Sequence, residues 1–87
     1  MTPLVDTLFR KVTYTCRSCG SRQRIPVRRV HVFERFHRLE HGEPVLIACP
    51  TCRDGLQIPS PYRTHTGHTV EISANALPDN AVIHSFY

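Results

Sequence analysis

The stretch VTYTCRSC at residues 12–19 is matched by VLIACPTC at residues 45–52, 33 positions later. In each stretch apolar side chains alternate with other residues before the first cysteine, which is typical of a β-strand. After its second cysteine and five intervening residues, each stretch reaches an Ile-Pro pair, at residues 25–26 and 58–59. The repeat predicts two similar units, each made of a strand, a tight turn and a second short extended segment.

The four cysteines, Cys16, Cys19, Cys49 and Cys52, are candidate ligands of one structural metal ion. Two thiolates three residues apart on a tight turn can face the same ion. Two such turns supply four sulfurs at tetrahedral positions about 2.3 Å from zinc. Two disulfides, in one of three connectivities, are the alternative.

The residues after the two cysteine pairs differ. Gly20 follows Cys19 directly and suits a turn position with positive φ. Arg53 takes the equivalent place in the second turn, and Gly55 comes two positions later. The sequence therefore predicts the same ligand set in both turns but leaves the symmetry of the second turn open.

The motifs YTCRSCG at 14–20 and ACPTC at 48–52 resemble the zinc-ribbon family in the broad sense that includes rubredoxin-like folds. The 29 residues between Cys19 and Cys49 are also similar to the gap in rubredoxins. The resemblance implies either a structural zinc ion or, as in rubredoxins, an iron ion that carries electrons. Rubredoxins are typically acidic and contain Trp, whereas this chain is basic and has none. We therefore expect one Zn²⁺ and keep a rubredoxin-like iron carrier as a distant alternative.

The length of 87 residues indicates one domain, 1–87, with a metal-binding core at 10–62 and a C-terminal strand extension at 63–87. With no Trp, 4 Phe and 3 Tyr, the apolar core is small, and metal binding can supply stability that it lacks. We expect an α+β fold, a small zinc ribbon with short antiparallel strands, a helix in the insert and a strand-rich C-terminal extension.

The insert between the two units predicts a helix over residues 28–40, and a strand that opens at residues 30–32 is the alternative. Val32, Phe36 and Leu39 are spaced as one apolar stripe, with Phe33 beside them, and Gly42 is a plausible C-cap. In the extension, strands are expected at 69–73 and 81–87, separated by a turn at 77–80.

Positive charge is concentrated in the first half of the chain. The net charge is +4, and nine of the eleven basic residues lie in residues 10–38, where Glu34 is the only acid. Arg offers a planar fork that grips phosphate in two places. A solvated surface without a partner is the alternative interpretation. The candidate nucleic-acid-binding residues are Arg17, Arg22, Arg24, Arg28, Arg29, Arg35 and Arg38.

Other classes of protein fit the sequence less well. The longest strongly apolar run, 45–49, is too short to span a membrane, and residues 1–9 do not look like a secretory signal. We expect an intracellular, cytoplasmic protein or a virion component, with no membrane partner and no small-molecule substrate. The six histidines are interpreted as ordinary surface or loop residues, including His65 and His68, which lie close enough in sequence to approach a metal.

No catalytic residue is expected, because no phosphate-binding glycine loop, paired carboxylates or nucleophile with a base is recognisable. The sequence favours a non-catalytic zinc-ribbon binding module or accessory subunit that docks on nucleic acid, on a protein assembly, or on both, through a basic Arg-rich face. The alternative is a structural or adaptor subunit of a large assembly, such as a virion or multisubunit machine, without nucleic-acid contact.

Overall fold

Each repeat unit forms a β-hairpin around its cysteine turn. The structure is a computed structural model and describes residues 11–52 and 54–85. Strand β1 (Lys11–Cys16) pairs antiparallel with β2 (Arg22–Pro26), and β3 (Val45–Ala48) pairs antiparallel with β4 (Leu56–Pro59). Along β1 every second side chain is buried, as the alternating pattern predicts.

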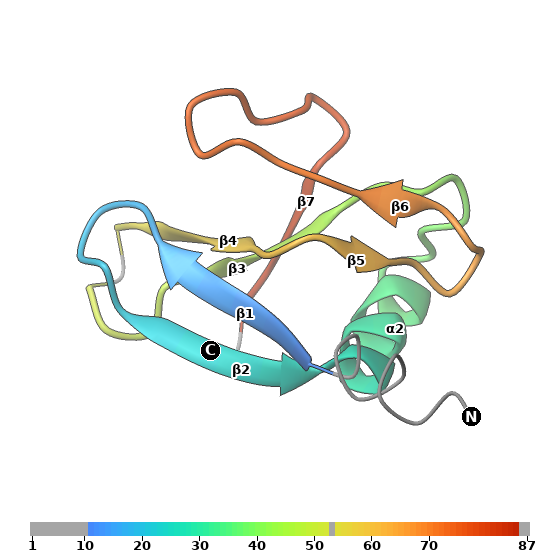
Figure 1. The fold of residues 1–87 in the computed structure, drawn as a ribbon, viewed down its shortest axis with the longest axis horizontal. Coiled ribbons are helices and arrows are strands. Elements are labelled where there is room, and N and C mark those ends of the chain that lie inside the picture. Colours follow the sequence, from blue (N-terminus) through green and yellow to red (C-terminus); the bar gives the residue numbers. More distant parts are fainter. Residues whose placement is uncertain (1–10, 53, 86–87) are drawn as a thin grey trace, which may run out of the picture.

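The two hairpins join through their inner strands to make one sheet. Strand β1 pairs antiparallel with β4, and the order across the sheet is β2-β1-β4-β3-β7 (Figure 1). Thr15 therefore has Arg22 opposite it on one side and Ile58 on the other. This joining of the hairpins brings the two cysteine turns to the same end of the sheet, because β1 and β3 both run toward it.

The last strand departs from the antiparallel arrangement that we expected. Strand β7 (Val82–His84) runs parallel to β3, with Val45 opposite Val82 and Ile47 opposite His84. The chain first forms a small hairpin of β5 (Tyr62–Arg63) and β6 (Thr69–Val70). It then crosses back through residues 71–81 and enters β7 at the end where β3 begins, which requires parallel pairing. Of the expected final strand 81–87, residues 86–87 lie outside the described residues.

The insert forms helix α2 (Val27–Phe36), but its buried side differs from the predicted stripe. Val32 and Phe36 are 55% and 73% exposed, and Val30, Phe33 and Glu34 face the core instead. The helix ends at Phe36, and Arg38 then adopts a positive φ of 58°, so Leu39 is buried from outside the helix. The expected extent of 28–40 and the stripe are therefore wrong.

A buried carboxylate explains the error. Glu34 is fully buried, and its Oε1 accepts hydrogen bonds from the backbone N–H of His65 and from the His65 ring at Nδ1. Since a charged residue holds an inward position, the apolar pattern along the helix points to the wrong side. Gly42 has a positive φ of 80°, but it lies six residues past the end of the helix and does not cap it.

The core lies between α2 and the inner face of the sheet, which we define as the face that bears Val12, Tyr14 and Ile47. The Tyr14 hydroxyl donates to the Val45 carbonyl at 2.9 Å, and the Val45 N–H donates to the Tyr62 hydroxyl at 3.1 Å. Buried apolar and aromatic side chains form one cluster: Val12, Tyr14, Ile25, Val30, Phe33, Leu39, Val45, Ile47, Tyr62 and Val70.

The other side of the sheet is its outer face. Leu46 alternates with Val45 and Ile47 along β3 and is also buried, so both faces of β3 are covered. The segment between β6 and β7 crosses the sheet away from α2 (Figure 1). Its residues Ile72 and Ala74 line a groove with Thr13, Thr15 and Ile58 of the outer face. No helix among the described residues is long and apolar enough to cross a membrane. The division of the chain at residues 62 and 63 stays a prediction.

Candidate metal centre

The four cysteine side chains converge at one end of the sheet. Cys16 ends β1 and Cys49 follows β3, while Cys19 and Cys52 lie in the turns that lead to the next strands. All four Sγ atoms lie within 4.8 Å of one another. The structure therefore brings together the four residues that the sequence singled out as metal ligands.

The spacing of the sulfurs fits a tetrahedral ion. The Sγ atoms of Cys16 and Cys52 are 3.7 Å apart, and those of Cys19 and Cys49 are 3.6 Å apart. A tetrahedron with metal–sulfur bonds of about 2.3 Å has edges of about 3.8 Å. A disulfide needs about 2.05 Å, and all four cysteines are free. The thiol set thus has the geometry and the donor chemistry to hold one metal ion.

Backbone N–H groups support the sulfurs in both turns. The N–H groups of Ser18 and Cys19 donate to Cys16 Sγ, each at 3.3 Å. The N–H groups of Thr51 and Cys52 bond Cys49 in the same way. Because these donors come from the second and third residues after the first cysteine of each pair, the two turns orient that thiol alike.

The turns differ in how they close. The Cys16 N–H donates to the carbonyl of Ser21, five residues on, whereas the Cys49 N–H donates to that of Gly55, six residues on. Gly20 has a φ of 77°, as its turn position requires. Gly55 is needed for space instead, because a Cβ there would lie 2.4 Å from Cys16 Sγ and 2.9 Å from Cys52 Sγ.

A row of hydrogen-bonded polar side chains contacts two of the four cysteines. The sequence analysis did not identify these residues. The Ser21 hydroxyl lies 3.1 Å from Cys19 Sγ and 3.2 Å from Cys49 Sγ. Gln57 Nε2 approaches the same hydroxyl at 3.5 Å, and Gln57 Oε1 accepts a hydrogen bond from Gln23. The signal in the sequence was Gln57 itself, a buried polar residue between the apolar neighbours of β4.

The thiols have unequal pKa values. The hydrogen bond with Ser21 is the main cause that lowers the pKa of Cys49 to about 5. Burial raises the pKa of Cys52 to about 12, and the backbone N–H of Cys19 lowers that of Cys16. Cys16 and Cys49 therefore favour the thiolate even without a metal, whereas Cys52 beside them favours the thiol. Binding of a metal must displace a proton from Cys52.

The seven candidate arginines are all exposed, but they do not share one face. Arg22 and Arg24 lie on β2 and Arg17 directly follows β1, whereas Arg28, Arg29 and Arg35 belong to α2 and Arg38 follows it. The sheet separates these two groups, because α2 packs on the inner face. The basic Arg-rich face that the sequence suggested is thus divided into two surfaces.

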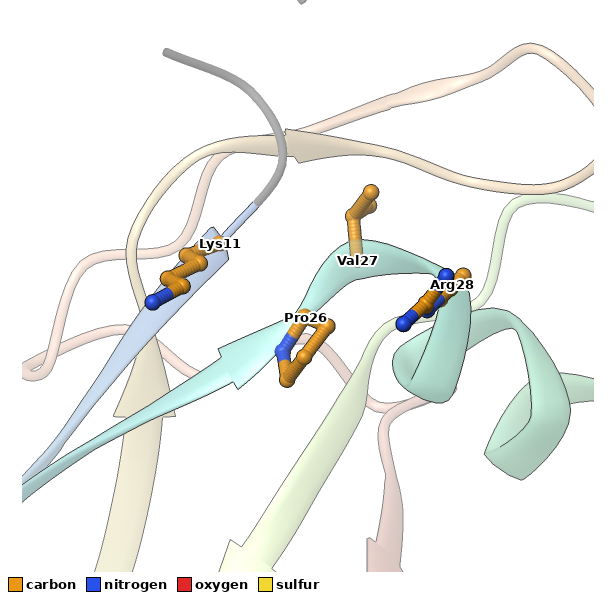
Figure 2. A pocket seen from close by; sticks show the side chains of 4 residues that line it. All are labelled: Lys11, Pro26, Val27 and Arg28. Carbon is orange, nitrogen blue, oxygen red and sulfur yellow. The ribbon is translucent and has the colours of Figure 1, made fainter. Parts of the chain in front are cut away.

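Part of the helix group borders a hollow at the start of α2. This hollow, of about 480 Å³, is lined by Lys11, Pro26, Val27 and Arg28 (Figure 2). Lys11 begins β1, whereas Cys16 ends it, so the hollow lies at the end of the strand away from the metal centre. The hollow and the cysteine cluster are separate features.

The histidines do not add ligands to the cluster. His65 bonds Glu34, and His68 Nδ1 lies 2.8 Å from the Thr66 hydroxyl. His37 Nε2 lies 3.1 Å from His84 Nδ1. Within residues 11–52 and 54–85, one group of three or more metal-ligating side chains lies close enough together to share an ion, and it consists of the four cysteines. Comparison with protein-family models, with curated proteins and with solved structures gives no match.

Proposed function

We propose that this chain is a non-catalytic zinc-binding module that docks on nucleic acid, as an accessory factor or subunit, through its exposed arginines. The observation that carries the proposal is the cluster of four thiols within 4.8 Å on a small sheet with exposed guanidinium groups nearby. Four thiolates fill a tetrahedral ion and leave no open position for a substrate, which is the pattern of a structural site.

Zinc is the ion that we propose for this site. The small core of the domain gives the metal a role in folding, since binding to a site absent from the unfolded chain contributes directly to stability. Free thiols also fit a reducing intracellular compartment. Metal analysis of protein purified without added metal should give one zinc per chain and a colourless solution. One iron per chain and a red solution would instead support the rubredoxin-like alternative.

The nucleic-acid role is supported by the charge of the described residues. Arg17, Arg22 and Arg24 are exposed, and the one ion pair within residues 11–52 and 54–85 joins Glu34 to His65. The guanidinium groups are therefore not neutralised by described carboxylates. The test is binding of the zinc-loaded protein to DNA and RNA across a salt series. Affinity should fall steeply as salt rises, because bound arginines release counterions from phosphates. Absence of binding at low salt would refute this role.

A structural or adaptor subunit is the second candidate, and the exposed apolar residues favour it. Val32, Phe36 and Ile83 are at least half exposed, and Ile83 lies on β7 at one edge of the sheet. Exposed apolar side chains of this size are common at contacts with partner proteins. In this case the protein co-purifies with a defined assembly and fails to bind nucleic acid, and Phe36→Ser or Ile83→Ser releases it from that assembly.

A further inference from the structure

We infer that the outer face of β1 and β2 is the surface that docks the sugar–phosphate backbone of a nucleic acid. This outer strand surface consists of Thr13, Thr15, Arg17, Arg22 and Arg24. The inference rests on the proposed function and narrows it from a basic chain to one face of the sheet. The helix arginines are then not the docking surface.

The pairing of β1 with β2 places these side chains together. Thr13 is opposite Arg24, and Thr15 is opposite Arg22. The neighbouring pair of Val12 and Ile25, directly before Thr13 and Arg24 in the register, is buried in the core beneath α2. Since successive side chains of a strand point to opposite faces, the threonine–arginine pairs must lie on the face away from the helix.

The spacing along β2 suits consecutive phosphates. Arg22 and Arg24 are two residues apart on one strand, which separates their side chains by about 6.8 Å. Neighbouring phosphates along a nucleic-acid backbone are separated by a similar length. A strand holds its residues at fixed intervals, so the backbone positions from which these two side chains reach a row of phosphates are set without ordering a loop.

Polar groups continue the surface beside β2. Thr13, Thr15, Arg17 and Ser60 line a groove of about 340 Å³ with the segment after β6. The Arg17 Nη1 lies 3.5 Å from the carbonyl of Ala74, at the far side of this groove. Hydroxyl groups and guanidinium groups are the donors that usually contact phosphate oxygens. The groove therefore extends the positive strip with further hydrogen-bond donors.

The electrostatic surroundings distinguish this surface from the arginines at the C-terminal end of α2. In the described part of the chain no arginine forms an ion pair with a carboxylate, Arg17, Arg22 and Arg24 included. Arg35 and Arg38 instead border a hollow that also contains Glu40, beside the C-terminal end of α2. A helix C-terminus carries partial negative charge, which disfavours an anion there. The outer strand surface is thus a better match for a polyanion than the C-terminal end of α2.

The test compares two triple variants of equal charge. One is Arg17→Gln, Arg22→Gln and Arg24→Gln together; the control is Arg28→Gln, Arg29→Gln and Arg35→Gln together. Binding of the zinc-loaded proteins to two DNA duplexes of unrelated sequence and to an RNA hairpin is measured between about 50 and 200 mM salt. Circular dichroism and zinc content establish that both variants fold.

The strand variant should lose about three units of the slope of log affinity against log salt, and the helix control should keep the wild-type slope. Each phosphate contact contributes a factor of about 3.5 over this fourfold salt range, so the wild type should weaken about 40-fold more than the strand variant. Equal losses in both variants, or a larger loss in the helix control, would overturn the inference while leaving nucleic-acid binding intact.

Two further outcomes separate the inference from the function beneath it. If the wild type binds no nucleic acid at low salt, the proposed function fails. If polyglutamate at matched charge displaces DNA from the wild type as well as unlabelled DNA does, the surface binds acidic polymers in general and its assignment to nucleic acid is overturned. Weaker competition by polyglutamate supports the assignment.

Discussion

Replacement of Gly55 by alanine tests how closely the second turn encloses the sulfurs. The added Cβ would lie 2.4 Å from Cys16 Sγ, 2.9 Å from Cys52 Sγ and 3.1 Å from Ser18 Cβ. Ordinary van der Waals contact begins at 3.4 Å, so the Cys16 sulfur must move by about 1 Å or the turn must shift. Metal–sulfur bonds of about 2.3 Å do not stretch by such an amount.

The free-energy cost of Gly55→Ala should resemble that of adding a methyl group to a packed interior, which is about 1–3 kcal/mol. If the metal-bound state carries this cost, zinc affinity falls about 5- to 150-fold. Competition with a chelator of known affinity measures the loss, and the absorption spectrum of the cobalt-substituted protein reports distortion of the tetrahedron.

Gly20→Ala is the matched control in the other turn. No heavy atom lies within 4 Å of its added Cβ, but its φ of 77° strains a residue with a side chain. This variant should lose about 1 kcal/mol of folding stability while the cobalt spectrum stays unchanged. The reasoning is refuted if Gly55→Ala binds zinc as tightly as the wild type and gives an identical cobalt spectrum.

Further substitutions test the ligands, their supports and the buried carboxylate. Cys49→Ser should lose the metal and the cooperative thermal transition, and retention of both in calorimetry and metal analysis would contradict a structural role. Ser21→Ala should release zinc to a chelator faster than Ser18→Ala, because the Ser21 hydroxyl lies within hydrogen-bond distance of two of the sulfurs. Equal release rates would show that the Ser21 hydroxyl does not stabilise the metal site. His65→Ala should cost about 1–3 kcal/mol in chemical denaturation by leaving buried Glu34 with fewer donors, and Glu34→Gln should cost less. Zinc should be lost as pH falls, since protons compete for the thiolates, and the pKa of Cys49, lowered to about 5, keeps that thiolate charged over a wider acidic range than an ordinary cysteine; zinc retention that does not change between neutral pH and pH 4 would contradict this.

The hairpins and the cysteine cluster were predictable because their signals are local. Alternating burial over residues 11–16 and the three-residue spacing within each cysteine pair are both set by neighbours in the sequence. The offset between the repeats then implies that the second unit forms the same elements as the first. The extent of the metal-binding core can therefore be predicted without knowing how the two hairpins pair with each other.

The parts that sequence reasoning missed depend on contacts between distant residues. The inward side of α2 is decided by Glu34, whose partner His65 lies 31 residues away. The parallel pairing of β7 depends on the path of residues 71–81 across the sheet. Division of the arginines into two surfaces depends on which face of the sheet the helix covers, and the sequence alone does not specify that face.

The strand order places the two halves of this domain side by side as complementary pieces. Strands β1 and β2 precede residue 40, β3 and β4 follow residue 44, and the ladder between β1 and β4 joins them at the centre of the sheet. A chain cut within residues 40–44 would give two peptides, each with one pair of cysteines: one contains β1 and β2, and the other contains β3, β4 and β7. Folding of this pair would become bimolecular, with the metal as the link that makes their association tight. The two peptides could therefore serve as a split-protein reporter, in which zinc would promote their association and a chelator would reverse it.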